Sequence, residues 1–327
     1  MNLVNQKTRV VGVDISSDFT TYALVDVRGN ILAKDEFPTA ECPTVASFVN
    51  RLCESIVKLV EANGGYETVR SVGVSSPSAS FVTGSIEHAA NLPWKGVVPL
   101  AAMMRDQLGL AVGVANDAHA TALGESVYGS AHGMKNYIVI HLGTGLGSCF
   151  FSEGREHLGK NGYAGEFGHI CMVPEGGRQC GCGHTGCLET YVNNKGIIQT
   201  AREMMAASDE PSLMRSLDDL SPRTIVECCE QGDKMAQEVF RYTGKILGWG
   251  LANYACIVSP EAIVLTGGIF KAGKWLLEPT QEAFEKHIFH NMQGRVKLLL
   301  STLETSDREV LGASALAWDV EEYSLFK

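Results

Sequence analysis

Three things that this sequence of 327 residues lacks narrow the class of protein it encodes. It has no apolar run near the roughly 18 residues that a membrane-spanning helix needs. Its first ten residues, MNLVNQKTRV, lack the apolar core of a signal peptide. Positive charge is also scarce, because 27 Lys and Arg stand against 37 Asp and Glu. We therefore expect a soluble cytoplasmic protein that binds neither membranes nor the phosphate backbone of a nucleic acid.

The composition that remains is that of a globular protein with large buried cores. Hydrophobic residues make up 45% of the chain and charged residues 20%, which argues against disorder. At about 150 residues per domain, the length predicts two domains. In a cytoplasmic chain, the ten cysteines are expected to be thiols or metal ligands rather than disulfides.

The hydrophobic pattern predicts the same order of elements twice along the chain. The first run has strands at 9–15, 20–27, 31–37, 69–74 and 111–115, with helices at 43–63, 100–108 and 118–128. The second has strands at 137–142, 148–151, 155–158, 262–266 and 296–300, with helices at 188–205, 234–257, 275–288 and 310–323. This repetition predicts a duplicated α/β unit built around mixed sheets.

Polar and glycine residues follow several of the predicted strands. Ligands of open α/β sheets gather at the carboxyl ends of strands, so this placement predicts a nucleotide and magnesium site. Glycines let backbone N–H groups approach phosphate oxygens, and a threonine hydroxyl adds a donor. Each glycine turn alone is explained as well by a ligand-free hairpin, so the prediction depends on their convergence. The residues concerned are Asp14, Gly143, Thr144, Gly145, Gly267 and Gly268.

Cys180, Cys182 and Cys187 lie within eight residues, and His169 precedes them. Three thiolates and one imidazole make a full tetrahedral zinc set with no open position, so the expected role is a structural Zn²⁺. His184 competes with His169 as the nitrogen ligand.

Carboxylates near this cluster and after the strand at 111–115 are candidates for sugar chemistry. Asn116 and Asp117 could simply cap a helix, or Asp117 could accept a hydroxyl proton during phosphoryl transfer. Glu166 and Glu189 could be solvated surface, or a pair of fixed acceptors for the hydroxyls of a sugar.

The segments GEFGHI and CGCGHTGCLE resemble the signature of the ROK family of sugar kinases and sugar-responsive repressors. The resemblance extends along nearly the whole chain, through NLPW at 91–94, ANDAHATALGE at 115–125, GTGLG at 143–147, TGG at 266–268 and LGAS at 311–314. It implies an actin-like, hexokinase-like (ribonuclease H-like) α/β fold of two domains with a central cleft. The smaller domain would be 1–116 plus 308–327, and the larger domain, 117–307, would carry the zinc knot.

The resemblance also assigns roles to single positions. Asp117 matches the catalytic base, and His169 would hold sugar with one ring nitrogen and zinc with the other. Asp14 and the turn from Gly143 to Gly145 match the phosphate-binding turns, and Gly267 with Gly268 matches the adenosine end. The matches to substrate-binding residues are Asn91, Asn116, Asp117, Glu166, His169 and Glu189.

Three stretches depart from the family pattern, one of them the turn near GTGLG, where Gly147, Ser148 and Cys149 replace a longer glycine run. The first turn, D-x-G-G-T in the family, is here Asp14 followed by Ile-Ser-Ser-Asp, so any positive φ there would be strained and Asp18 would repel a γ-phosphate. We expect a working site with weakened ATP affinity. The second stretch is GVSSPSAS, 73–80, where the family tends to have a Gly-rich G-x-P-G pattern next to the sugar.

The expected function is an ATP-dependent hexose kinase that phosphorylates the 6-hydroxyl of glucose or a related sugar, with Mg²⁺ accompanying ATP. One alternative is a kinase for N-acetylglucosamine or another N-acetylhexosamine. Another is a non-catalytic sugar-sensing protein or a ROK-type regulator without its DNA-binding domain, since only about eight residues precede the first strand. A homodimer or homotetramer is expected from the resemblance.

Overall fold

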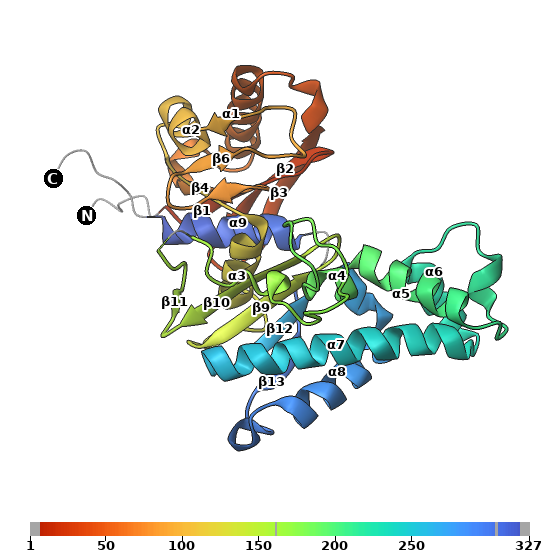
Figure 1. Ribbon diagram of the computed structural model, residues 1–327. Coiled ribbons are helices and arrows are strands. Elements are labelled where there is room, and N and C mark those ends of the chain that lie inside the picture. The colour runs from red at the N-terminus through yellow and green to blue at the C-terminus, as the bar shows by residue number, and fades with distance from the viewer. Residues whose placement is uncertain (1–6, 161, 305–306, 321–327) are drawn as a thin grey trace. The chain divides into compact units, whose positions relative to one another are not determined.

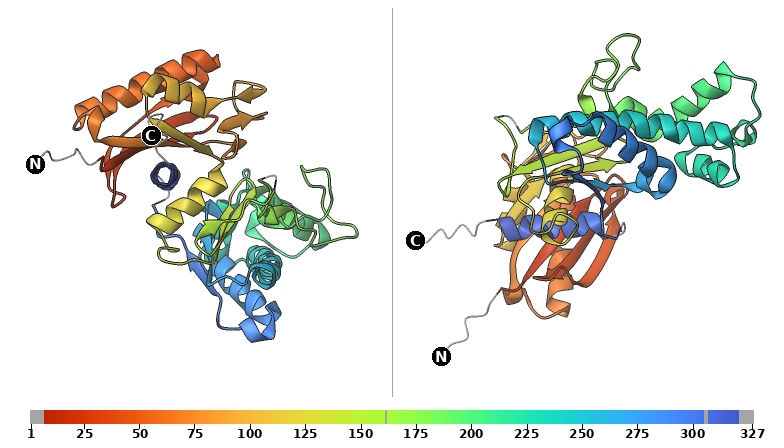
Figure 2. Two further views of the ribbon diagram at one scale, coloured as in Figure 1. Left: turned by 90° about the vertical axis from the view of Figure 1, so that its left-hand side faces the viewer. Right: turned by 90° about the horizontal axis from the view of Figure 1, so that it is seen from below.

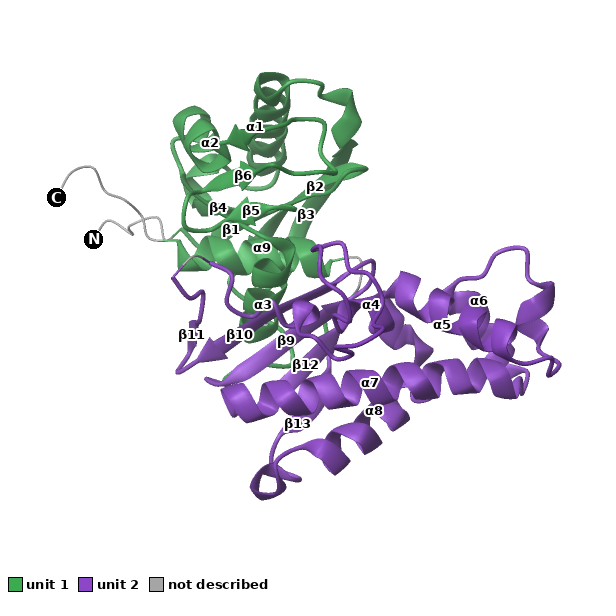
Figure 3. Cartoon of the chain, viewed as in Figure 1, with its two compact units in different colours: residues 1–133, 302–327 green, residues 134–301 purple. Residues whose placement is uncertain are grey.

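The computed structural model describes residues 7–160, 162–304 and 307–320. The chain divides into two compact units (Figure 3): unit 1 is residues 1–133 with 302–327, and unit 2 is residues 134–301. These divisions differ from the boundaries expected after residues 116 and 307. The reason is that helix α3 (Asp117–Val127) packs along α9 (Arg308–Asp319) within unit 1. Residues 321–327 of the expected smaller domain, and so the end of the helix expected at 310–323, lie outside the described residues.

Unit 1 is built on a five-stranded mixed sheet with the strand order β3-β2-β1-β4-β8. Strands β1, β2 and β3 are antiparallel neighbours, whereas β4 and β8 run parallel to β1. A small antiparallel sheet, β5-β6-β7, was not expected from the sequence. The strands are β1 (Arg9–Ile15), β2 (Phe19–Asp26), β3 (Ile31–Pro38), β4 (Val69–Ser75), β5 (Ala79–Ser80), β6 (Ser85–Glu87), β7 (Val97–Val98) and β8 (Ala111–Ala115); the remaining helices are α1 (Val45–Ala62) and α2 (Leu100–Leu108).

Helices cover both faces of this sheet (Figures 1 and 2). The central strand β1 is accordingly apolar on both sides. Val11 and Val13 pack into the core formed with α1 and α2, whereas Val10 packs against α9 on the opposite face. A Cβ atom at Gly12 would overlap the carbonyl oxygen of Val310, and one at Gly73 would overlap that of Ala313. These two glycines therefore let α9 lie directly on the sheet.

The register of the parallel strands brings their carboxyl ends together in unit 1. Asp14 of β1 is opposite Ser75 of β4, and Ser75 is opposite Ala115 of β8. The chain then continues from Ala115 into Asn116 and the first turn of α3. Three neighbouring strand ends thus deliver polar side chains to one edge of the sheet, as ligand-binding α/β sheets do.

Unit 2 repeats the mixed five-stranded sheet, with the order β11-β10-β9-β12-β13. Strands β9, β12 and β13 are parallel, and β10 and β11 complete an antiparallel hairpin arm. The strands are β9 (Tyr137–Leu142), β10 (Leu146–Ser152), β11 (Arg155–Glu156), β12 (Ala262–Thr266) and β13 (Lys297–Leu300). The helices are α4 (Glu189–Val192), α5 (Asn194–Ala207), α6 (Pro222–Glu230), α7 (Lys234–Val258) and α8 (Lys274–His287).

The long helix α7 and its neighbour α8 lie side by side against the sheet of unit 2 (Figure 1). Ile140 and Leu142 of β9 share a buried core with Leu247 and Leu251 of α7. At Gly248 a Cβ atom would lie 2.5 Å from the carbonyl oxygen of Thr280, so glycine permits the close approach of the two helices. The duplicated mixed-sheet units predicted from the sequence are thus confirmed.

The prediction of a single helix over 188–205 is wrong. The segment forms two helices, α4 and α5, because Asn193 adopts an extended backbone and its side chain accepts a hydrogen bond from the N–H of Gly196, which caps α5. Helix α6, which starts at a Ser221 capping box with Pro222 in its first turn, was not expected either. Within the described residues, no helix combines the length and the apolar character that crossing a membrane requires.

Candidate functional site

The strand ends of unit 1 carry an acidic cluster, defined here as Asp14, Asp117 and Glu309. Asp14 is the penultimate residue of β1, Asp117 begins α3, and Glu309 lies in the first turn of α9. The hydroxyl of Ser75 donates a hydrogen bond of 3.1 Å to Oδ1 of Asp117. Asn116 caps α3 by accepting from the N–H of His119 at 2.9 Å. The structure thus brings Asp14 and Asp117 together, as expected.

Both aspartates of the cluster have raised pKa values. Burial, followed by the charges of Asp117 and Glu309, raises the pKa of Asp14 to about 7, while a hydrogen bond from Ser75 opposes the shift. Desolvation raises the pKa of Asp117 to about 6, although the residue is exposed to solvent; the hydrogen bond from Ser75 lowers the pKa and the charge of Glu309 raises it. A carboxylate with a pKa near 6 is a stronger base than an ordinary aspartate and is still ionised at neutral pH.

The turn after β1 adopts a conformation that serines tolerate. The hydroxyl of Ser16 donates to the carbonyl of Phe19 at 2.9 Å and accepts from the N–H of Phe19 at 3.1 Å. Ser16, Ser17 and Asp18 do not have positive φ angles. The strain considered for this Ser-Ser-Asp turn is therefore absent, and the exposed charge of Asp18 is its main departure from the family pattern.

Asn91 lies exposed on a loop that is anchored at both flanks. The buried indole of Trp94 donates to the carbonyl of Cys42 at 3.0 Å. The ammonium group of Lys95 donates to the carbonyls of Ala89, Ala90 and Leu92. These bonds fix the backbone on either side of Asn91, whose exposed side-chain amide makes no hydrogen bond to another residue that the structure describes.

In unit 2, Glu189 and the start of α5 hold the glycine turn between β9 and β10. Oε2 of Glu189 accepts a hydrogen bond from the N–H of Leu146 at 2.8 Å. A Cβ atom at Gly145 would lie only 2.8 Å from the same oxygen. The side-chain amide of Asn193 donates to the carbonyl of Thr144 at 3.0 Å, and the N–H of Asn194 donates to that of Gly143. Glu189 therefore supports the turn with one of its two carboxylate oxygens.

The second glycine turn of unit 2 follows β12. Gly267 has a φ of +110°, and a Cβ atom there would overlap the carbonyl oxygen of Leu142. Glycine is thus required at this position. A Cβ atom at Gly268 would meet nothing within 4 Å, so the backbone of Gly268 faces open space. The turn accordingly offers an accessible main chain next to the end of β9.

His169, Cys180, Cys182 and Cys187 form a Cys₃His set whose potential ligand atoms all lie within 4.8 Å of one another. Sγ of Cys182 is 3.7 Å from Sγ of Cys187, and Sγ of Cys180 is 3.6 Å from Nδ1 of His169. A tetrahedral zinc with ligand bonds of about 2.0–2.3 Å separates its ligands by about 3.5–3.8 Å. The set fits Zn²⁺, and His169 rather than His184 belongs to it.

The two ring nitrogens of His169 face different partners. Nδ1 faces the thiols, whereas Nε2 lies 3.9 Å from Oε2 of Glu166. The exposed Glu166 and the Nε2 edge of His169 therefore form a polar pair on the side of the ring that faces away from the cysteines. This arrangement allows the double use of His169 that the family resemblance implies.

A buried tyrosine fixes the segment that carries this pair. The Tyr254 hydroxyl of α7 donates to the carbonyl oxygen of Phe167, and the two rings stack with centroids 4.0 Å apart. Phe150 of β10 stacks on the Phe167 ring from 5.8 Å. Because Phe167 lies between Glu166 and His169, these contacts limit the freedom of both.

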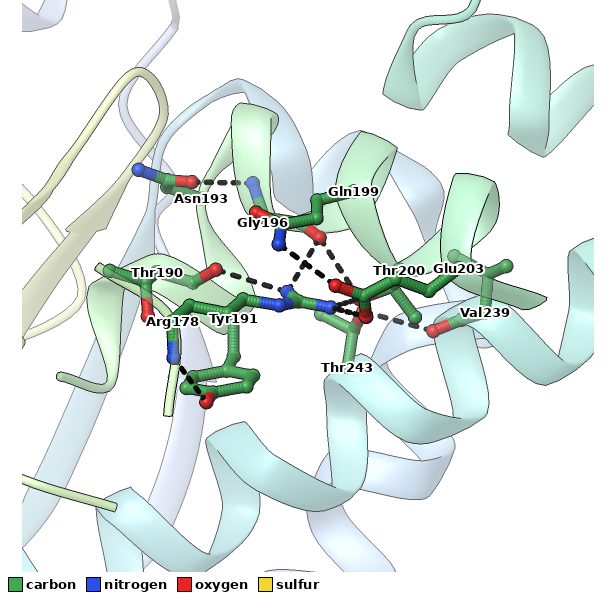
Figure 4. A network of polar contacts seen from close by, with 10 residues as sticks. All are labelled: Arg178, Thr190, Tyr191, Asn193, Gly196, Gln199, Thr200, Glu203, Val239 and Thr243. Carbon is green, nitrogen blue, oxygen red and sulfur yellow. Dashed lines mark hydrogen bonds and ion pairs between the residues drawn. The ribbon is translucent and has the colours of Figure 1, made fainter. Parts of the chain in front are cut away.

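Arg178 ties the loop of the Cys₃His set to α5 (Figure 4). Its guanidinium donates to the carbonyls of Thr190 and Gly196, to the hydroxyl of Thr200 at 2.9 Å and to Oε2 of Glu203 at 2.5 Å. The side chain is only 8% exposed and lies 4.6 Å from the centroid of the Tyr191 ring. A buried arginine with this many acceptors rigidifies the loop that it belongs to.

Four residues that the structure places in or behind these sites were given no role of their own from the sequence: Arg178, Tyr254, Glu309 and Ser75, the last of which lies in the departing stretch 73–80. Ser75 follows directly after the strand expected at 69–74, so its position at a strand end was available from the sequence. The other three depend on tertiary packing, for which the local sequence carries no signal.

The two mixed-sheet units, with carboxylates and glycine turns at their strand ends, are those of an α/β protein with the actin-like, hexokinase-like fold. The chain belongs to the ROK family, whose model matches residues 10–320.

The relatives include both enzymes and regulators. The glucokinase of Halalkalibacterium halodurans is 33% identical over 314 residues, which cover 94% of this chain and 94% of that protein. A ROK family glucokinase from Streptomyces griseus, solved in complex with glucose and AMPPNP, matches with a TM-score of 0.75 at 30% identity over 95% of this chain and 99% of that one. The N-acetylglucosamine repressor of Escherichia coli O157:H7 is 27% identical over 94% of this chain and 74% of its own length. The glucokinase-like class of enzyme expected from the sequence is confirmed.

Proposed function

We propose that this chain is an ATP-dependent hexose kinase that transfers the γ-phosphate of ATP to the 6-hydroxyl of glucose or a close relative. The observation that carries the proposal is the placement of Asp117, which begins α3 at a strand end next to Asp14 and whose exposed carboxylate accepts a hydrogen bond from Ser75. A base that is ionised at neutral pH and fixed at a strand end suits the removal of a hydroxyl proton.

In the proposed reaction, Asp117 accepts the proton of the sugar's primary hydroxyl as that oxygen attacks the γ-phosphorus. The bond between the γ-phosphorus and the bridging oxygen breaks, and the electron pair leaves with ADP. Such a transfer depends mainly on positioning and charge stabilisation. The Gly143–Gly145 turn and the open backbone of Gly268 are proposed to hold the nucleotide, with Gly267 shaping the second turn.

Asp14 is proposed to face the Mg²⁺ that accompanies ATP. Its pKa of about 7 reflects burial and the neighbouring charges of Asp117 and Glu309. A divalent cation would supply the opposite charge that this cluster favours, and carboxylates are the ligands that Mg²⁺ prefers. The residues present therefore fit the ion.

The residues proposed to bind the sugar are Asn91, Asn116, Glu166, His169 and Glu189. Glu166 and Nε2 of His169 offer adjacent polar atoms, and Glu189 offers the carboxylate oxygen that does not hold Leu146. A structural Zn²⁺, held by the Cys₃His set through Nδ1 of His169, would fix the orientation of this imidazole.

A second candidate substrate is N-acetylglucosamine or another N-acetylhexosamine. It is favoured by the similarity of nearly the whole chain to an N-acetylglucosamine repressor. The same relative supports a candidate of another class, a sugar-sensing protein without phosphoryl transfer. The similarity of nearly the whole chain to a glucokinase supports the kinase over the sensor.

The test is a panel of hexoses and amino sugars with ATP and Mg²⁺, followed by coupled detection of ADP. We expect turnover with glucose or N-acetylglucosamine, and the ratio of their kcat/KM values decides between the two kinase candidates. Calorimetric binding of a sugar without any turnover across the panel would support the sensor instead. Light scattering of the same sample would test the expected homodimer or homotetramer.

A further inference from the structure

Ser75 occupies the centre of the strand edge where the acidic cluster lies. It is the last residue of β4, the strand between β1 and β8, and its backbone is paired with Asp14 on one side and Ala115 on the other. The residue is only 1% exposed. A serine on a buried, doubly paired strand has little freedom, so its hydroxyl is confined between Asp14 and Asp117, and it donates a hydrogen bond of 3.1 Å to Oδ1 of Asp117.

The hydroxyl of Ser75 is a feature of this chain rather than of the family pattern. Pro77 aligns residues 75–78 with the G-x-P-G pattern, so Ser75 and Ser78 both stand at glycine positions. Ser78 keeps a glycine-like backbone, with a φ of +57°. The path of the loop is therefore retained, while Ser75 adds a donor that glycine cannot supply.

We propose that Ser75 is a positioning residue for the proposed phosphoryl transfer: its hydroxyl holds Oδ1 of Asp117 so that Oδ2 is presented to the sugar's hydroxyl. The inference rests on the proposed function, in which Asp117 is the base. Ser75 acts through Asp117 and takes no proton itself. The neighbouring charge of Glu309 acts on the same carboxylate, but an ionised carboxylate cannot donate a hydrogen bond to it.

The experiment compares Ser75→Ala with Ser76→Ala. Ser76 is a suitable control because it is the adjacent buried serine, and its hydroxyl makes only a 3.4 Å contact with the carbonyl of Pro77. We expect Ser75→Ala to lower kcat about tenfold with an unchanged KM for the sugar, because a misdirected base slows only the chemical step. Ser76→Ala should leave kcat unchanged. A KM effect without a kcat effect, or equal losses in both variants, would overturn the proposal.

A crystal structure of Ser75→Ala supplies a readout that does not require activity. The proposal predicts that the Asp117 carboxylate turns away from its wild-type orientation or adopts more than one. An unchanged single orientation overturns the positioning role. If the wild-type protein phosphorylates no sugar, the proposed function fails on its own account, and this structural comparison still decides whether Ser75 orients Asp117.

Discussion

The acidic cluster of unit 1 and the Cys₃His set of unit 2 contrast in how their polar groups are held. The cluster places Asp14 and Asp117 near Glu309, and the resulting burial and repulsion raise the pKa values of both aspartates. Around the Cys₃His set, Arg178 and Tyr254 instead anchor the backbone through hydrogen bonds. Destabilised charges are typical of sites that bind ions or move protons, whereas saturated networks are typical of scaffolds.

The difference predicts opposite consequences of mutation. Changes in the acidic cluster should impair activity and leave the fold intact or more stable, because they remove repulsion. Changes around the Cys₃His set should weaken the fold of unit 2 first and sugar binding as a consequence.

Removing one thiol from the Cys₃His set should remove the metal. We expect about one zinc ion per wild-type chain by elemental analysis and almost none in Cys182→Ser, together with a large fall in thermal stability, since structural zinc contributes directly to folding. Cys256→Ser is the control, because Cys256 is also exposed but lies outside the set. Full zinc content in Cys182→Ser, or none in the wild type, would contradict the assignment.

Breaking the Arg178 network should cost more than breaking an exposed ion pair of the same type. Arg178→Met removes four hydrogen bonds of a buried guanidinium, although Glu203 keeps Gln199 as a donor and Gly196 keeps Thr200, and we expect a loss of about 3 kcal/mol in the free energy of unfolding. Arg223 pairs with Glu227 on the surface, where it is 89% exposed, so Arg223→Met should change stability by about 0–1 kcal/mol. Urea unfolding of both variants measures the difference, and equal losses would show that burial of Arg178 is irrelevant.

Replacing Asp14 should change how stability depends on pH. The pKa of Asp14 rises from 3.8 to about 7 on folding, so the folded state binds this proton more tightly and the contribution of Asp14 to stability is lost as pH rises through about 7. Asp14→Asn should therefore gain about 2 kcal/mol relative to wild type between pH 5 and pH 8, a value reduced by the solvent contact of the side chain. Unfolding in magnesium-free buffer tests this, and parallel stability curves would contradict it.

The smallest effect is expected at the turn after β1. Because residues 16–18 have no positive φ, glycines should add little, whereas Asp18→Thr removes a charge that repels the nucleotide. We expect Asp18→Thr to lower the KM for ATP a few-fold and Ser16→Gly with Ser17→Gly to change it little. A higher KM for ATP in Asp18→Thr would indicate that this carboxylate assists binding.

Much of the fold and part of the candidate site could be predicted because their signals are local. Strand β1, helix α2 and strand β9 begin and end at the predicted residues, and the spacing of the cysteines indicated the Cys₃His set. The break between α4 and α5 was missed because a single capping asparagine interrupts an otherwise helical pattern. His169 could not be preferred over His184 by spacing, since the choice depends on how the loop folds back.

The residues that support the Cys₃His loop from behind, Arg178 and Tyr254, could not be predicted for a related reason. Arg178 contacts residues 12 to 25 positions away, and Tyr254 reaches Phe167 across 87 positions. Neither contact leaves a periodic or motif-like trace in the sequence. Ser75 is intermediate, because its strand end was predictable but its bond to Asp117 requires the register of β4 against β8.

The role of Asp117 is tested most directly by ADP release from the sugar panel, measured side by side for the wild type and Asp117→Asn. We predict sugar-dependent ADP formation by the wild type at neutral pH, and a loss of about 10³-fold or more in kcat for Asp117→Asn, which should still fold and bind sugar. Comparable turnover by Asp117→Asn would contradict the assignment of Asp117 as the base, and absence of turnover by the wild type would contradict the proposed kinase activity itself.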